Sequence, residues 1–261
     1  MWLVALLLGV VEGLTEFLPI SSTGHLILTS ELLDFHGKRA EAFEIFIQGG
    51  AILAVLVEYR ARFTQLAQGL PRSPEARAFA VRLALAFLPA AAIGFLAHDF
   101  ISDRLFSPRT VAFALIGGAL LILLVERMPL KVRTTSTDAM TWHQALGIGA
   151  AQCLALWPGF SRSAATILGG LGMGLDRRSA TEFSFFLAVP TIVAASGYGL
   201  LKNASQLEAG DAVWLGVATL VSFAVAWATI RWLLRYVATH DFRVFAYYRL
   251  ALGVIVLATL H

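Results

Sequence analysis

The side chains best suited to chemistry are concentrated near the N-terminus, between Glu12 and His25. This stretch reads Glu-Gly-Leu-Thr-Glu-Phe-Leu-Pro-Ile-Ser-Ser-Thr-Gly-His and is flanked by apolar residues. The four-residue spacing of Glu12 and Glu16 puts both carboxylates on one face of a helix. A divalent cation would offset their repulsion, because hard cations take carboxylate and phosphate oxygens together. Two alternatives stay open: a pair that faces a wet vestibule or a helix N-terminus, and two protonated buried acids.

The end of the same stretch combines a helix breaker with hydroxyls and an imidazole. Pro19 ends one helix, and Ser21 or Ser22 is expected to cap the next, whose free N–H groups suit a phosphate. Ser21 and Thr23 are predicted to bind substrate, although capping without any ligand is an alternative for Ser21. Ser22 and His25 share a helix face, which suits a nucleophile and its base or a proton donor to a leaving group.

A second polar stretch, Pro158–Thr166, interrupts another apolar region and reads Pro-Gly-Phe-Ser-Arg-Ser-Ala-Ala-Thr. The guanidinium of Arg162 can fork onto phosphate oxygens and stays charged at any working pH. Arg162 is alternatively an ion-pair partner of Glu12 or Glu16, which it would release when substrate displaces the carboxylate. Three hydroxyl side chains around it are predicted to bind substrate: Ser161, Ser163 and Thr166.

Composition indicates the environment of these groups. The chain has 261 residues, of which 58% are hydrophobic and 14% are charged, and its mean hydropathy is +0.74. Soluble domains carry about 25% charged residues, so we predict an all-α polytopic membrane protein with one integral domain, 1–261. The net charge of +3 is attributed to loops between spans rather than to nucleic-acid binding. The sequence contains no zinc-type Cys/His spacing, P-loop or dinucleotide fingerprint.

Eight apolar regions must position the two polar stretches. Two of them are broken by polar residues, Gly and Pro, namely Met1–Ser30 and His143–Asp176. We predict that both are re-entrant helical hairpins, because irregular backbone at membrane depth must be buried in protein or line a cavity. The other six are predicted transmembrane helices: Phe43–Tyr59, Phe79–Ala97, Val111–Val125, Phe183–Leu201, Val213–Leu234 and Phe245–Leu260.

The distribution of Lys and Arg predicts the orientation of these segments. Placing the four richest groups in the cytoplasm satisfies the positive-inside rule and puts both termini outside. The halves, about 1–127 and about 143–261, then become inverted repeats of one hairpin and three transmembrane helices, with a site near the midplane at their interface. Arg249 fits poorly and is expected to pair with a carboxylate or to reach the membrane surface. The four groups are Arg60, Arg62, Arg72, Arg77 and Arg82; Arg127, Lys131 and Arg133; Arg177 and Arg178; and Arg231, Arg235, Arg243 and Arg249.

With both polar stretches at this separation, the chain resembles the bacitracin-resistance undecaprenyl-diphosphatase family over its whole length. Phe43–Ala54 and Glu182–Pro190 are also similar to that family. The resemblance implies hydrolysis of undecaprenyl diphosphate to undecaprenyl phosphate, which recycles the lipid carrier of cell-wall synthesis and confers bacitracin resistance. It also implies a multi-pass enzyme of the bacterial plasma (inner) membrane, a site that opens to the periplasm, and a divalent cation, with magnesium expected.

By position, the resemblance makes Glu12 and Glu16 the acidic pair and metal ligands, Ser22 and His25 the catalytic hydroxyl and imidazole, and Arg162 the diphosphate clamp. It also implies that Ser161, Ser163 and Thr166 line the phosphate pocket. Two mechanisms stay open: attack by Ser22 with His25 as base, or attack by His25 or by a water that His25 activates. The rival function is a lipid-phosphate transporter of inverted-repeat architecture that hydrolyses nothing. Oligomeric state does not follow from the sequence.

Overall fold

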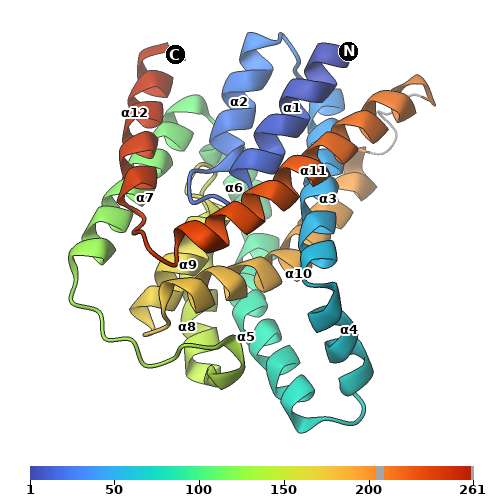
Figure 1. Cartoon of the computed structure of the whole chain (residues 1–261). Coiled ribbons are helices and arrows are strands. Elements are labelled where there is room, and N and C mark those ends of the chain that lie inside the picture. Colours follow the sequence, from blue (N-terminus) through green and yellow to red (C-terminus); the bar gives the residue numbers. More distant parts are fainter. Residues whose placement is uncertain (204–208, 260–261) are drawn as a thin grey trace.

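The computed structural model describes residues 1–203 and 209–259, and in these ranges it contains helices and connecting turns but no β-strand (Figure 1). The all-α prediction is therefore confirmed. Six helices are short: α1 (Trp2–Thr15), α2 (Ser22–Leu32), α4 (Arg60–Gly69), α6 (His98–Leu105), α8 (Trp142–Gln152) and α9 (Arg162–Gly172). Six are longer: α3 (Lys38–Glu58), α5 (Pro74–Leu96), α7 (Pro108–Arg127), α10 (Arg177–Asn203), α11 (Ala212–Tyr236) and α12 (Arg243–Thr259).

Four of the six predicted transmembrane helices are long and apolar enough to cross a membrane, namely α5, α7, α10 and α11. The segment Ala42–Glu58 of α3 meets the same criterion only together with α4, from which it is bent by 76°. The described part of helix α12 has 17 residues, which at 1.5 Å per residue is about 26 Å, compared with a hydrocarbon core of about 30 Å. The predicted end of that segment, Leu260, lies outside the described residues.

Both predicted hairpins are helix–break–helix units. Helices α1 and α2 are separated by residues 16–21, and α8 and α9 by residues 153–161, which include a short 3₁₀ helix, Cys153–Leu156. In Figure 1 the first hairpin occupies the upper part of the molecule, near both termini, and the second lies in the lower part. Both breaks therefore point toward the middle of the bundle.

Glycines allow each hairpin to approach a long helix closely. A Cβ atom at Gly9 of α1 would lie 2.7 Å from the carbonyl oxygen of Ala218 in α11, and one at Gly149 of α8 would lie 2.8 Å from that of Ala86 in α5. Small residues permit such backbone contact between membrane helices. The first hairpin is thus packed on a helix from the C-terminal half, and the second on a helix from the N-terminal half.

Helix α10 contributes several large side chains to a core that many of the helices share. Phe183, Phe185 and Leu187 of this helix are fully buried, and α10 packs against α3, α5 and α9. Phe185 meets Phe17, in the break of the first hairpin, edge to face with ring centroids 5.4 Å apart. The break of the first hairpin therefore packs against a buried aromatic residue of α10.

Candidate active site

The two polar stretches meet in the structure, as the sequence predicts. Arg162 at the start of α9 forms an ion pair with Glu16, with 3.1 Å between Nη2 and Oε1. Only 11% and 7% of the two side chains are exposed. Ser163 donates a hydrogen bond from Oγ to the carbonyl oxygen of Leu18 at 2.8 Å. A charged and a neutral contact therefore join segments that are far apart in the chain.

The helices that follow the two breaks begin in the same way. Ser21 and Ser161 are the N-caps of α2 and α9, and their φ angles are 74° and 77°, in the left-handed region. Their Oγ atoms accept hydrogen bonds from the backbone N–H groups of Gly24 (3.3 Å) and Ala164 (3.2 Å). The prediction that Ser21 or Ser22 caps the next helix is confirmed, and the capping residue is Ser21. Non-glycine residues rarely adopt this conformation, and where they do, the strain is concentrated at functional sites.

Glu16 links the predicted clamp to the predicted hydroxyl. Ser22 donates a hydrogen bond from Oγ to Glu16 Oε2 at 2.6 Å, while Glu16 Oε1 faces Arg162. One carboxylate thus orients both side chains. Because Ser22 and Arg162 are the first residues of α2 and α9, both lie at helix N-termini, which favour anions.

His25 makes different contacts from those that its spacing suggests. Its Nδ1 lies 2.7 Å from the carbonyl oxygen of Ser21, and its Nε2 lies 2.7 Å from the hydroxyl of Tyr248 on α12. A carbonyl can only accept, so Nδ1 carries the hydrogen, and in a neutral ring Nε2 then accepts from Tyr248. The hydrogen bonds of His25 therefore go to its own helix cap and to α12, whereas that of Ser22 goes to Glu16.

Ser184 of α10 belongs to the site but did not emerge from the sequence. Arg162 donates from Nη1 to its carbonyl oxygen at 2.8 Å and approaches its Oγ at 3.3 Å. The hydroxyls of Thr166 and Ser184 are hydrogen-bonded at 2.7 Å. Ser184 is the one polar residue in the run Phe183–Pro190, and that isolation was the available signal.

Glu12 is the most unusual group in the site. Its side chain is fully buried, and neither carboxylate oxygen has a hydrogen-bond partner among the described residues. A buried, unpaired carboxylate is costly, so a cation that binds there would recover part of that cost. Within the described ranges, no three His, Cys, Asp or Glu side chains gather closely enough to hold a metal by themselves. The residues present fit a cation whose remaining ligands come from substrate oxygens, hydroxyls or water.

The remaining predicted substrate-binding residues have different surroundings. The hydroxyls of Ser161 and Ser163 lie 3.0 Å apart and are buried. Thr23 is half-buried, and its hydroxyl forms no hydrogen bond with any residue that the structure describes. Ser163 therefore takes part in the contact between the hairpins through Leu18, and Ser161 supports it from within the second hairpin.

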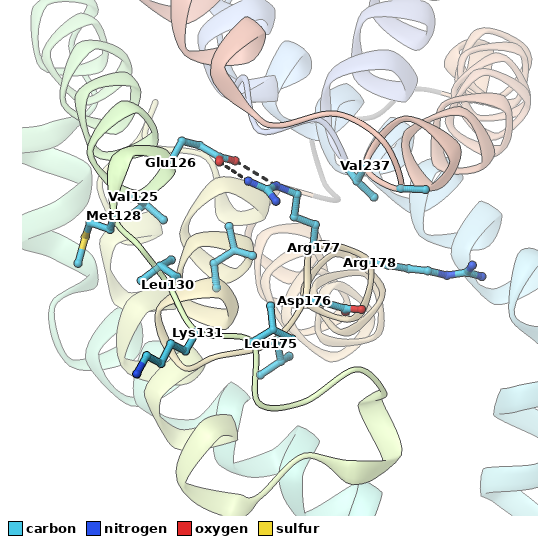
Figure 2. A pocket seen from close by; sticks show the side chains of 13 residues that line it. Val125, Glu126, Met128, Leu130, Lys131, Leu175, Asp176, Arg177, Arg178 and Val237 are labelled. Atoms are coloured by element: carbon cyan, nitrogen blue, oxygen red, sulfur yellow. Dashed lines mark hydrogen bonds and ion pairs between the residues drawn. The ribbon is translucent and has the colours of Figure 1, made fainter.

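A separate cavity of about 420 Å³ lies among the ends of α7, α9, α10 and α11 (Figure 2). Glu126 and Arg177 form an ion pair at its wall. Its lining also includes Lys131 and Arg178, but none of the residues predicted for the site. This cavity is therefore distinct from the meeting point of the two breaks.

The comparisons with known proteins cover nearly the whole chain. The family model described as bacitracin resistance protein BacA matches residues 5–255. A protein of Methylococcus capsulatus named undecaprenyl-diphosphatase is 52% identical over 260 residues, which are 100% of this chain and 95% of the relative. A Dechloromonas aromatica protein of the same name is 52% identical over 98% of this chain and 93% of its own. A third relative, undecaprenyl-diphosphatase 2 of Rhodospirillum rubrum, is also 52% identical, over 98% of this chain and 93% of its own length.

The matched range includes both polar stretches, and residues of these two stretches form the contacts between the hairpins. The chain belongs to the bacitracin resistance protein BacA family.

Proposed function

We propose that this protein hydrolyses undecaprenyl diphosphate to undecaprenyl phosphate and inorganic phosphate at the meeting point of the two breaks. The observation that carries the proposal is the buried sequence of contacts Ser22–Glu16–Arg162, which brings a hydroxyl, a carboxylate and a guanidinium together from two hairpins. The names of the relatives in the family favour hydrolysis over the transporter alternative.

Arg162 is well placed to clamp the diphosphate. Ser184 holds Nη1, so the guanidinium plane is oriented before substrate arrives. A phosphate oxygen that takes the place of Glu16 Oε1 would receive the hydrogen bond from Nη2, and the free N–H groups at the starts of α2 and α9 would add further donors. Such preorganised donors offset the charge on the phosphoryl oxygens in the transition state.

We propose Ser22 as the nucleophile and Glu16 as the acceptor of its proton, because their hydrogen bond is already formed. The Oγ atom forms a bond to the terminal phosphorus, the bond from that phosphorus to the bridging oxygen breaks, and undecaprenyl phosphate leaves. Water then cleaves the phosphoserine and releases inorganic phosphate. In the alternative, His25 or a water that it activates attacks, and no phosphoserine forms. Mass spectrometry of acid-quenched enzyme distinguishes the two, since only the first leaves phosphate on Ser22.

Glu12 and Glu16 are the proposed ligands of a divalent cation, with magnesium expected. The unpartnered oxygens of Glu12 support this assignment. The bound cation would neutralise charge on the diphosphate and on the leaving group. Hydroxyls that have no other task, such as that of Thr23, are then available to the phosphate.

We also propose that the chain is an inverted repeat, with halves of about 1–127 and about 143–261, in the bacterial inner membrane. Gly149 and Ser161 follow Gly9 and Ser21 by the same interval, and each pair plays matching roles in helix packing and helix capping. The positive-inside rule then opens the site to the periplasm. Labelling of single cysteines on a Cys153→Ala background in intact cells tests this, because Trp2→Cys should react with impermeant reagents and Arg72→Cys should not.

The decisive experiment for hydrolysis measures phosphate release from undecaprenyl diphosphate by purified protein in detergent, where no membrane has to be crossed. We expect release that depends on a divalent cation. If the wild-type protein releases no phosphate under these conditions but moves the lipid between the leaflets of vesicles, the transporter alternative is correct.

A further inference from the structure

Arg249 of α12 is a fully buried charged residue outside the proposed reaction. The sequence predicts that it pairs with a carboxylate or reaches the membrane surface, but among the residues that the structure describes it has no carboxylate partner, and its side chain is fully buried. Its guanidinium donates to four backbone carbonyl oxygens: from Nε to Leu115 (3.1 Å), from Nη1 to Pro19 (3.1 Å), and from Nη2 to Ala114 (3.1 Å) and Gly159 (3.2 Å). A buried charge is costly unless it is well hydrogen-bonded, and these four acceptors supply that solvation.

Two of the four acceptors occupy matching places in the two breaks. Pro19 lies two residues before the cap Ser21, and Gly159 lies two residues before the cap Ser161. One guanidinium therefore holds the turns that introduce both α2 and α9. The other two acceptors belong to consecutive residues of α7, so both turns are tied to a long helix.

Helix α7 leaves room for this arrangement. A Cβ atom at Gly118 would collide with the guanidinium of Arg249, whereas one at the neighbouring Gly117 would meet nothing within 4 Å. The space that Arg249 needs thus depends on a single glycine, one helical turn beyond the carbonyls that Arg249 contacts on α7.

We propose that Arg249 is a positioning residue, which sets the two breaks at a fixed separation so that Ser22 and Arg162 face one phosphoryl group. Arg249 contacts neither the hydroxyl of Ser22 nor the guanidinium of Arg162 directly, and it acts through the turns at Pro19 and Gly159. The consequence for turnover rests on the hydrolysis proposed above, whereas the consequence for the breaks does not. A nucleophile displaced by about 1 Å loses on the order of a hundredfold in rate, so the expected defect lies in kcat rather than in KM.

The chain offers a matched pair of variants to test this. Gly118→Ala displaces the guanidinium, and Gly117→Ala makes the same change on the exposed side of α7. In Gly118→Ala we expect faster amide hydrogen exchange in 17–25 and 157–166, a kcat at least tenfold lower and a KM within threefold of wild type. Gly117→Ala should match the wild type in all three. Equal exchange and equal kcat in the two variants would overturn the proposal.

Substitution of Arg249 itself provides the second measurement. Arg249→Lys keeps the charge but reaches fewer carbonyls, and should recover part of the kcat that Arg249→Met loses. Val256→Ala, a buried packing change on the same helix, controls for stability alone. If Arg249→Met and Val256→Ala lower Tm by the same amount and have the same kcat, Arg249 is only structural and the proposal is wrong.

The Gly118→Ala measurement remains decisive if Arg249→Met does not fold. If the wild type releases no phosphate, the proposed hydrolysis fails, whereas the exchange data still decide whether Arg249 holds the two breaks.

Discussion

Arg162→Lys tests the clamp most directly, because it keeps the charge and removes only the fork. Arg162 uses Nη2 for Glu16 at 3.1 Å and Nη1 for the carbonyl oxygen of Ser184 at 2.8 Å. A lysine ammonium is a point charge that cannot reproduce both directions. The variant should therefore fold with the ion pair to Glu16 at least partly retained, but it should present a poorly oriented cation to the diphosphate.

The magnitude follows from the bonds that are lost. A hydrogen bond to a charged group contributes about 1.5–3 kcal/mol, and one or two such bonds to the transition state disappear. We expect a loss of about 2–4 kcal/mol, which is on the order of 30- to 1,000-fold in kcat/KM. The guanidinium is mostly buried, so water replaces little of this loss.

The assay is phosphate release from undecaprenyl diphosphate in detergent, with kcat and KM determined separately and Tm measured on the same sample. Arg177→Lys is the matched control, since it makes the same change in an ion pair with Glu126 at the separate cavity. It should stay within twofold of wild type. If Arg162→Lys keeps kcat/KM within threefold of wild type while both proteins melt normally, the clamp assignment is refuted.

Three further predictions concern the other site residues. Ser22→Ala should lower kcat by more than about a thousandfold, a loss typical of a missing nucleophile, and should abolish the phosphoserine. The control Ser30→Ala, on the same helix, should do neither. Full turnover by Ser22→Ala would exclude Ser22 as nucleophile. Glu12→Gln removes a buried unpaired charge, so in the presence of a chelator the variant should melt at a higher temperature than wild type. Added magnesium should raise its Tm by less than it raises that of wild type. An equal rise in Tm would show that Glu12 does not bind the cation. Tyr248→Phe removes the hydroxyl that is hydrogen-bonded to His25 and should lower kcat about three- to tenfold. Tyr247→Phe is the control and should keep the kcat of wild type. Identical kinetics of the two variants would show that the contact between Tyr248 and His25 has no role in turnover.

Several features of the site were predictable because they depend on local chemistry. A proline or glycine followed by serines in an apolar run indicates a helix break and a new cap, and this held for Ser21 and Ser161. Carboxylates and an arginine at membrane depth indicate one shared polar site, and the contact between Glu16 and Arg162 confirmed it. Apolar segment length also located α5, α7, α10 and α11, which are long and apolar enough to cross a membrane, but it did not predict the short helices α4 and α6.

The partners within the site were not predictable, because they come from helices remote in the chain. A three-residue spacing places Ser22 and His25 near one another on α2, but it does not show that Glu16 lies within 2.6 Å of Ser22 or that Tyr248 reaches His25. Arg249 illustrates the limit best. The residue types alone suggested a carboxylate partner, whereas its true acceptors are main-chain carbonyls, which every residue carries and which only the packing of α7, α12 and the two breaks brings together.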